Sequence, residues 1–335
     1  MAELDLSQFG YERLDCIGKG QYGSAFLARP MDPSVGTEQV VAKTVTLEAL
    51  NPHDRKLALQ EVHVLRKLSH PNIVAYKDSF LETSDRDGDP ASLVIVMEFC
   101  PGGDMRQRVK RAKAEQALFE EARVNLWFKE IASAMQHIHA NKILHRDLKT
   151  SNIFLSADEH IKLGDFGISR VLEATNAAAT TVVGTPYYMS PELCRAKTYG
   201  RESDIWAVGC CIFEICMHRH PFRGKSLVEL VTSIVQDDFE DIVVNGYSPE
   251  LSELLKRVLA KEANERPSLE DVLRSPALAG GGAGGTGGAS PVTGGASPPG
   301  RKAPSLRPQA PPTRGVAAAP KADASGTKYF TPRDE

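Results

Sequence analysis

The sequence predicts an α+β fold in two parts, one rich in strands and one helical, followed by a tail of different composition. Between residues 11 and 99 the chain has short Val-rich or alternating segments that are typical of strands. Between residues 120 and 274, apolar residues recur at three- and four-residue spacing, which is typical of helices. A strand-rich first third and a helix-rich remainder favour two lobes with a cleft between them.

The first part contains four expected strands and one expected helix. The strands are predicted at residues 11–17, 24–29, 39–45 and 93–99. The helix is indicated by apolar residues at 57, 64, 65 and 68, with Asp54 as a plausible N-cap and Glu61 on the inward face.

The second part begins with a long helix from about Glu120. Its apolar stripe consists of Val124, Trp127, Phe128, Ile131, Met135 and Ile138. Further helices are predicted at residues 203–217, 226–236, 249–260 and 268–273.

The tail differs in composition from the rest of the chain. Residues 280–300 are almost entirely Gly, Ala, Ser, Thr and Pro, and residues 301–320 are rich in Pro, Ala and Arg. Such a segment cannot bury enough apolar area to offset its ordering entropy, so we expect it to be disordered.

Composition and charge argue against several classes of protein. The chain has 335 residues, of which 41% are hydrophobic and 25% charged, as in ordinary globular proteins. The net charge is −3, and because the tail after Pro276 carries seven basic and three acidic residues, the remainder stands at −7. An acidic body argues against a nucleic-acid partner. The most apolar run, Ile205 to Met217, is shorter than the roughly 20 residues that span a bilayer, so we expect no membrane partner.

The six cysteines form no C-x-x-C pair, so we expect free thiols in a reducing compartment. The N-terminus has no apolar signal-peptide segment. These observations favour a cytoplasmic protein, with the nucleus as the other possibility.

Gly18, Gly20 and Gly23 form a G-x-G-x-x-G motif. Glycines let backbone amides approach phosphates closely, because no Cβ intervenes. The motif alone also fits an ordinary hairpin turn or a dinucleotide-binding turn. A dinucleotide-binding turn opens a helix, whereas residues 24–29 have the pattern of a strand. Lys43 follows at the end of a second apolar strand.

The most informative stretch is His145-Arg146-Asp147-Leu148-Lys149, with Asn152 three residues later and Asp165-Phe166-Gly167 downstream. It offers a proton acceptor, a cation and amide and carboxylate oxygens, and such oxygens suit a hard cation. His137, His139 and His145 lack the further ligands of a zinc site at recognisable spacing. We interpret His145 as a packed core residue that supports this loop.

In this order, the motifs resemble those of the eukaryotic protein kinases over about residues 11–274. Two longer strings, residues 145–155 and 183–192, are similar to the NIMA-related serine/threonine kinases. The resemblance implies a bilobal protein kinase fold with a β-rich N-lobe and a helical C-lobe. The implied segments are an extension at 1–10, an N-lobe at 11–97, a hinge at 98–104, a C-lobe at 105–274 and the disordered tail at 275–335.

The resemblance implies that the cofactors are ATP and Mg²⁺. Lys43 would contact the α- and β-phosphates, oriented by an ion pair with Glu61. Adenine would bond the backbone of Glu98 and Cys100, with Met97 as gatekeeper and Asp104 near the ribose. By register, Ala25 and Val41 form the roof of the adenine site and Phe154 its floor. The full expected set is Ile17, Gly18, Gly20, Gly23, Ala25, Val41, Lys43, Glu61, Met97, Glu98, Cys100, Asp104 and Phe154.

For catalysis, the resemblance implies that Asp147 accepts or orients the proton of the substrate hydroxyl. Lys149 would neutralise the γ-phosphate, and Asn152 and Asp165 would hold Mg²⁺. Lys149 lies two residues after Asp147, which is the serine/threonine-type pattern.

The activation segment is expected at residues 165–192. Arg146 and Arg170 have the register of a cationic pocket for phosphorylated Thr181, with Thr180 as the alternative site. Thr185 would form the floor of the substrate site.

Three further residues have implied structural roles. Glu192 would form a buried ion pair with Arg266. Asp204 would brace, from a long helix, the backbone of the catalytic loop, which is residues 145–152.

The NIMA-related resemblance implies a role in the cell cycle or at microtubules, centrosomes or cilia. The expected partners are protein substrates with Ser or Thr acceptors, and an upstream kinase or a second copy that phosphorylates in trans. Many members carry coiled coils after the kinase domain, and this tail has none. Two rival functions remain: a pseudokinase scaffold, and an enzyme that phosphorylates small molecules.

Overall fold

The structure is a computed structural model, and it describes residues 5–20, 23–47, 62, 65–83, 90–164 and 186–279. These residues fall in one compact unit, Met1–Gly284. The second unit, Gly285–Glu335, lies outside the described residues, as does nearly all of the tail that we expect to be disordered.

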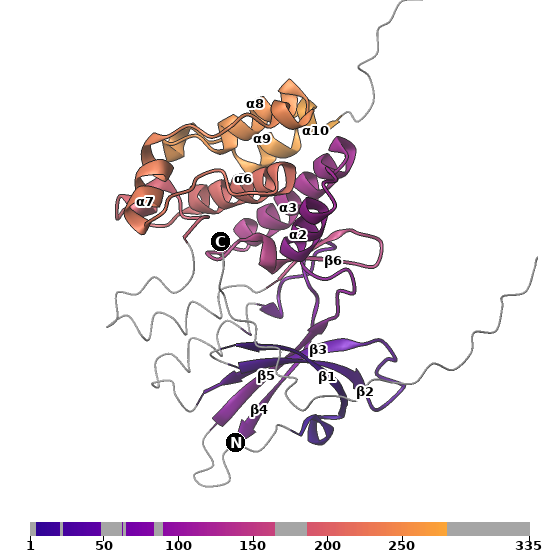
Figure 1. Ribbon diagram of the computed structural model, residues 1–335. Coiled ribbons are helices and arrows are strands. Elements are labelled where there is room, and N and C mark those ends of the chain that lie inside the picture. The colour runs from indigo at the N-terminus through magenta and orange to yellow at the C-terminus, as the bar shows by residue number, and fades with distance from the viewer. Residues whose placement is uncertain are drawn as a thin grey trace, which may run out of the picture. The chain divides into compact units, whose positions relative to one another are not determined.

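The first part of the chain forms a five-stranded antiparallel sheet (Figure 1). Its strands are β1 (Tyr11–Gly20), β2 (Gly23–Pro30), β3 (Val40–Thr46), β4 (Tyr76–Thr83) and β5 (Pro90–Glu98), in the order β1-β2-β3-β5-β4. Consecutive strands pair through β3, and β5 then lies between β3 and β4. In this arrangement the end of β5 lies beside the start of β3, because Glu98 pairs with Val40.

The two faces of the sheet have different environments because side chains alternate along each strand. Phe26, Ala28, Val40 and Ala42 are buried on one face. A short 3-10 turn, η1 (Leu6–Phe9), covers this face with the buried Leu6 and with Phe9, whose ring stacks on Phe80 at 4.8 Å. On the opposite face Val45, Leu93 and Ile95 pack against Val62, whereas Ala25, Val41 and Lys43 are half-buried.

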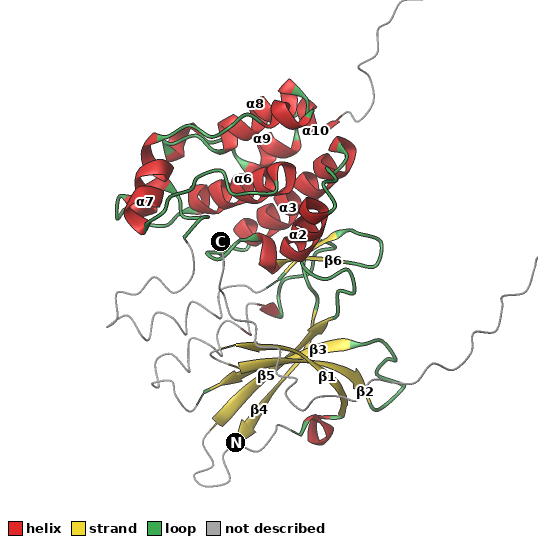
Figure 2. Ribbon diagram, viewed as in Figure 1, coloured by secondary structure: helices red, strands yellow, loops and turns green. Residues whose placement is uncertain are grey.

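The rest of the described chain is mainly helical (Figure 2). The longer helices are α2 (Met105–Ala114), α3 (Glu121–Ala140), α6 (Arg201–Met217), α7 (Leu227–Gln236) and α8 (Pro249–Val258). The shorter elements are η2 (Thr150–Asn152), α5 (Pro191–Cys194), η3 (Ile242–Asn245), η4 (Ala263–Glu265), α9 (Leu269–Leu273) and α10 (Pro276–Ala279). A two-stranded sheet, β6 (Ile153–Leu155) with β7 (Ile161–Leu163), follows the catalytic loop. Trp127, Phe128, Trp206 and Phe213 lie fully buried in one core built largely from α3 and α6.

The segment before β4 connects the sheet with β7. The N–H of Val74 donates to the carbonyl of Leu163 at 2.8 Å, and the N–H of Leu163 donates to the carbonyl of Asn72 at 2.8 Å. The β-rich N-lobe and helical C-lobe of the predicted fold class are thus confirmed.

Apart from the helix expected over 54–68, the expected elements are present with boundaries shifted by a few residues. The strand predicted at 93–99 begins at Pro90, and the helix predicted at 249–260 ends at Val258. The sequence reasoning missed β4 and α2. β4 has few strongly apolar residues, and α2 is dominated by Arg and Lys. The expected helix over 54–68 lies mostly outside the described residues, and within it Val62 is helical and buried.

All six cysteines are free thiols, as predicted. Among the helices that the structure describes, none combines the length and the apolar character that a membrane span requires.

The ordered fold extends past residue 274, where we expected the tail to begin. Helix α10 packs against α3 and α8, and its Leu278 is 2% exposed. The side chain of Asn125 in α3 donates to the carbonyl of Ala277 at 3.2 Å. The expected start of the tail at 275 is therefore wrong by at least five residues, because α10 buries Leu278 in the core.

We expect Leu278→Ala to lower the free energy of unfolding by about 2–4 kcal/mol, since it leaves a cavity in the core. Urea denaturation measures this change. Leu118→Ala is the matched control, because Leu118 is 48% exposed and its loss should cost under about 0.5 kcal/mol. Equal stability of chains ending at 274 and at 284 would contradict the anchoring role of α10.

Candidate active site

The glycine motif lies in a β-hairpin. Gly18 and Gly20 are in β1 and Gly23 begins β2, so a strand rather than a helix follows the motif. The dinucleotide-binding alternative is excluded. A Cβ at Gly23 would lie 1.7 Å from the carbonyl oxygen of Thr44, so the sheet itself requires glycine there. A Cβ at Gly18 would meet only Ala25, at an ordinary 3.7 Å, so the packing of protein atoms does not explain that glycine.

One half-buried face of the sheet brings together several predicted nucleotide contacts. Lys43 pairs across the sheet with Ala25 on β2 and Ile95 on β5. Val41 pairs with Leu27 and Met97 in the same way. Residues two apart on one strand share a face, so Ala25, Val41, Lys43 and Met97 share this one. Ile17, by contrast, is 47% exposed at the end of β1 nearest the motif.

The end of β5 is fastened to β7 through Glu98. Its Oε1 lies 2.8 Å from Nζ of Lys162, and its Oε2 accepts from the N–H of Ala75 at 3.1 Å. The N–H of Glu98 donates in turn to the carbonyl of Ala75 at 2.9 Å. These contacts fix the expected hinge at its first residue.

Beyond Glu98, the hinge turns toward β6. Among the described residues, none accepts a hydrogen bond from the N–H of Cys100, which is consistent with an adenine contact. Burial raises the pKa of the Cys100 thiol to about 12, so the thiol stays protonated and unreactive. The N–H of Gly102 donates to the carbonyl of Leu155 at 3.0 Å, which holds the turn against β6.

Asp104 has a structural role that the sequence reasoning did not assign. It is the N-cap of α2, where Oδ1 accepts from the N–H of Gln107 at 2.8 Å and Oδ2 from the side-chain amide of Gln107 at 2.6 Å. A ribose contact would have to use the remaining lone pairs of this carboxylate. Burial outweighs these hydrogen bonds and raises the pKa of Asp104. Asp104 also forms a β-bridge with Phe154, the expected adenine floor.

The catalytic loop gathers its predicted residues around one carboxylate. Nζ of Lys149 lies 2.9 Å from Oδ2 of Asp147, and Nδ2 of Asn152 donates to the same oxygen at 3.0 Å. Nδ2 of Asn152 also donates to the backbone carbonyl of Asp147 at 2.8 Å. The Asp147 side chain is 27% exposed, so its carboxylate is oriented and remains accessible.

The backbone of this loop is held from α6 by Asp204, as predicted. Oδ2 of Asp204 accepts from the N–H of His145 and Oδ1 from that of Arg146, each at 3.0 Å. The side chains of His139, at 2.7 Å, and Tyr199 also bond this carboxylate. Burial opposes ionisation of Asp204, but the hydrogen bonds outweigh it and lower its pKa. His145 is fully buried, in agreement with its interpretation as a core residue.

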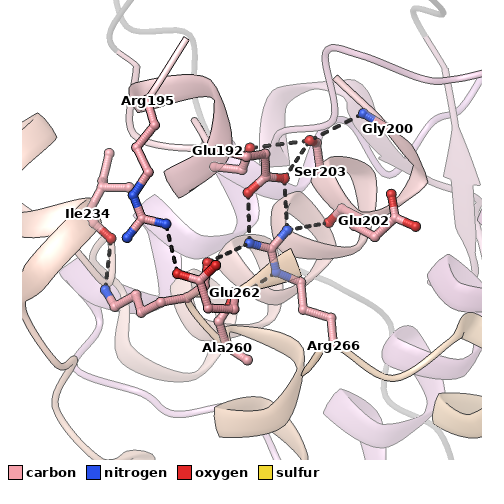
Figure 3. A network of polar contacts seen from close by, with 11 residues as sticks. Glu192, Arg195, Gly200, Glu202, Ser203, Ile234, Ala260, Glu262 and Arg266 are labelled. Carbon is pink, nitrogen blue, oxygen red and sulfur yellow. Dashed lines mark hydrogen bonds and ion pairs between the residues drawn. The ribbon is translucent and has the colours of Figure 1, made fainter. Parts of the chain in front are cut away.

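The predicted ion pair between Glu192 and Arg266 is present and bidentate (Figure 3). Nη1 and Nη2 of Arg266 lie 2.9 and 2.8 Å from the two oxygens of Glu192. The hydroxyl of Ser203 donates to Oε1 of Glu192 at 2.6 Å, and Arg266 also bonds the carbonyls of Glu202 and Ala260. Burial raises the pKa of Glu192, but these partners outweigh it and lower the pKa to about 2. The pair ties α5 to the residue that follows η4, and Ser203 and the carbonyl of Glu202 extend the contact to α6.

Several predicted residues lie outside the described part of the chain. These are Glu61, Asp165, Arg170, Thr180, Thr181 and Thr185. Their assignments remain predictions.

Residues 11–278 match the protein kinase domain family. The chain belongs to this family.

The kinase domain is similar to Nek serine/threonine kinases. It is 40% identical to human serine/threonine-protein kinase Nek5 over 269 residues, which are 80% of this chain and 36% of the relative. It is 40% identical to mouse Nek1 over 80% of this chain and 21% of the relative. With mouse Nek4 it shares 41% identity over 82% of this chain and 33% of the relative. The chain thus spans at most 36% of the length of these relatives.

Some residues of this kinase domain that position the site escaped the sequence reasoning. Lys162 bonds Glu98, and His139 and Tyr199 bond Asp204. The first two contacts join residues in different elements, and Tyr199 lies just before α6. Only the basic or aromatic character of these residues could have suggested the contacts.

The donor set fits ATP and Mg²⁺, which the protein kinase family implies. Because Asn152 uses its Nδ2 on Asp147, its Oδ1 remains the atom for a hard cation, although Ser151 approaches it at 3.4 Å. The N–H of Cys100, for which no acceptor is found among the described residues, fits a nucleotide. Asp165 would be the second metal ligand.

We expect Arg266→Ala to lower the free energy of unfolding by about 3–5 kcal/mol, because it leaves the buried Glu192 carboxylate without its cation. Chemical denaturation at pH 7 measures this loss. Arg274→Ala is the control, since its pair with Glu270 is exposed and worth under about 0.5 kcal/mol.

The role of the Glu192–Arg266 pair can also be tested through the pH dependence of the free energy of unfolding. The pKa of Glu192 is lower in the folded state than its ordinary value of 4.5. The ionised carboxylate therefore stabilises the fold at pH values above 4.5, and this stabilisation is lost as the pH falls toward about 2. Glu192→Gln should therefore flatten the acid limb of the stability profile. An acid limb equal to that of the wild type would contradict the role of the pair.

Proposed function

We propose that the protein is a serine/threonine protein kinase that transfers the γ-phosphate of ATP to protein hydroxyls. The observation that carries the proposal is the convergence of Lys149 and Asn152 on one oxygen of Asp147, at 2.9 and 3.0 Å. Phosphoryl transfer depends mainly on positioning and charge neutralisation, and this cluster supplies both.

Each residue of the cluster has a distinct task. Asp147 orients the substrate hydroxyl and accepts its proton. Lys149 neutralises charge on the transferred phosphoryl group. Asn152 and Asp165 hold Mg²⁺, which when bound neutralises the phosphate oxygens. Lys149 two residues after Asp147, together with the similarity to Nek kinases, favours serine and threonine over tyrosine.

The residues that would hold the nucleotide lie on the half-buried face of the sheet and at the hinge. The backbone of Glu98 and Cys100 would bond adenine, with Ala25 and Val41 on one side of the ring and Phe154 on the other. Met97 would limit the depth of the site. Lys43, oriented by Glu61, would contact the phosphates.

The cellular role that we propose is NIMA-related: control of the cell cycle, microtubules or cilia. The likeness of residues 145–155 and 183–192 and the similarity to Nek kinases support the NIMA-related relationship, and the cellular role is what that resemblance implies. The protein would act in the cytoplasm, at the cytoskeleton, centrosome or cilium, or in the nucleus. Its partners would be protein substrates with Ser or Thr acceptors.

The alternative is a pseudokinase-type nucleotide-binding scaffold. The accessible, hydrogen-bonded Asp147 argues against it, because a scaffold has no need of an oriented proton acceptor. A small-molecule kinase is a second alternative, and it predicts no peptide phosphorylation.

We expect Asp147→Ala to reduce phosphate transfer to a Ser/Thr peptide array by at least about a thousandfold, because proton acceptance and orientation are lost together. Radiometric transfer measures the rate. Asp158→Ala is the matched control, since Asp158 lies in the exposed turn between β6 and β7. Equal background for wild type and Asp147→Ala would favour the scaffold.

We further propose that phosphorylation activates the enzyme. A phosphate on Thr181, or on Thr180, would add about −1.5 to −2 charge and bond Arg146 and Arg170. An upstream kinase or a second copy acting in trans would place it.

We expect Thr181→Ala to lower kcat/KM at least about tenfold, since one charge-assisted hydrogen bond is worth about 1.5 kcal/mol or more. Thr175→Ala, in the same segment, should leave the rate unchanged. Intact-mass and peptide mass spectrometry of the active enzyme gives the decisive comparison. Active protein without phosphate on either Thr180 or Thr181 would refute the proposal.

A further inference from the structure

Thr150, which directly follows Lys149, is part of a buried cluster of three polar side chains. Its hydroxyl donates to Oε2 of Glu214 on α6 at 3.1 Å. The hydroxyl of Tyr188 donates to the same oxygen, and the two hydroxyl oxygens lie 3.0 Å apart. Each hydroxyl has a single hydrogen, so an ionised Glu214 can draw both onto one oxygen. Thr150 is fully buried and Glu214 is 7% exposed.

The two hydroxyls are the direct hydrogen-bond donors that the structure describes for the Glu214 carboxylate. His220 lies nearby, with Nδ1 3.7 Å from Oε2, but burial beside Arg106 and Arg223 lowers its pKa to about 4. At pH 7 His220 is therefore neutral. Burial raises the pKa of Glu214, and the hydrogen bonds from Tyr188 and Thr150 oppose that shift. An uncompensated carboxylate in this place would be costly.

The cluster joins two segments that carry the proposed chemistry. Thr150 begins η2, which follows Lys149 and ends at Asn152, and both Lys149 and Asn152 contact Asp147. Tyr188 lies in the segment that leads into α5, three residues after Thr185, the expected floor of the substrate site. One more hydrogen bond is described between the segment of Thr150 and the segment of Tyr188. It runs from the N–H of Thr150 to the Tyr188 hydroxyl, at 3.5 Å.

We propose that Thr150, Tyr188 and Glu214 form a positioning unit that aligns the peptide hydroxyl with Asp147. The inference rests on the proposed kinase activity and extends it to residues that do not touch substrate. Glu214 acts as the shared acceptor, so loss of either hydroxyl frees one segment relative to the other. Peptide alignment then suffers, whereas the nucleotide, which is held at the hinge, is unaffected.

The test measures steady-state kinetics with peptide and with ATP varied separately. Thr150→Val keeps the shape of the side chain and removes the hydroxyl, and Tyr188→Phe does the same for the ring. We expect each to lower kcat/KM for the peptide about tenfold, as for a lost hydrogen bond to a charged group. KM for ATP should stay within about twofold.

Two further variants separate positioning from general stability. Thr150→Ser restores the hydroxyl and should recover most of the rate. Tyr187→Phe is the matched control: Tyr187 stacks on His220 at 4.1 Å, and no hydrogen bond of its hydroxyl is described. It should behave like the wild type.

In the double variant Thr150→Val with Tyr188→Phe, the loss of kcat/KM for the peptide should be smaller than the product of the two single losses, because both hydroxyls act through Glu214.

The proposal is overturned if Thr150→Val leaves peptide kcat/KM unchanged, if Thr150→Ser fails to rescue it, or if the two single losses multiply. It is also overturned if KM for ATP rises as much as KM for the peptide. These outcomes require an active wild-type enzyme. A wild type without peptide transfer would instead refute the proposed function itself, and the positioning unit with it.

Discussion

The catalytic loop depends on one buried carboxylate, that of Asp204. Arg146 has φ of +64°, a left-handed conformation that costs a non-glycine residue about 1–2 kcal/mol. The hydrogen bonds from the N–H groups of His145 and Arg146 to the two oxygens of Asp204 stabilise this conformation. The bend brings Asp147 out toward Lys149 and Asn152, and the N–H of Asp147 closes it by donating to the carbonyl of His145 at 2.9 Å. Asp204 thus holds the two N–H groups at the start of the bend, and the side chain of Asn152 holds the carbonyl of Asp147 at its end.

Helix α6 extends this role along its whole length. It is buried nearly throughout, and its few polar side chains each hold a separate segment. Ser203 bonds Glu192 at the start of α5, Asp204 bonds the catalytic loop, and Glu214 bonds Thr150 and Tyr188. Asp204 lies in the first turn of the helix, where the positive end of the helix dipole favours a carboxylate. A buried helix can therefore fix three functional segments relative to one another, because its own position is set by the surrounding core.

The sheet is joined to the helical part by different means. Backbone hydrogen bonds between residues 72–74 and Leu163 form one connection, and the pair of Glu98 with Lys162 forms another beside it. Lys162 lies three residues before Asp165, so the same strand that supports the hinge leads to the expected metal ligand. The nucleotide and metal ends of the proposed site thus share β7 as a common support.

The sequence by itself determined the fold class, most strands and helices, and the positions of the motifs, because these depend on local periodicity and spacing. It also indicated the Glu192–Arg266 and Asp204 contacts, although only through resemblance to a family. It did not reveal α2 or β4, whose charged or weakly apolar residues give little periodic signal. Only the tertiary structure decided which side chains bond Asp204, that Asp104 caps α2, and that Glu214 joins Thr150 to Tyr188. The residues in the Glu214 cluster are 26 to 64 positions apart, and the His139–Asp204 bond spans 65. Such contacts exist only once packing of the core has placed α6 beside the loops, so no local pattern in the chain could specify them.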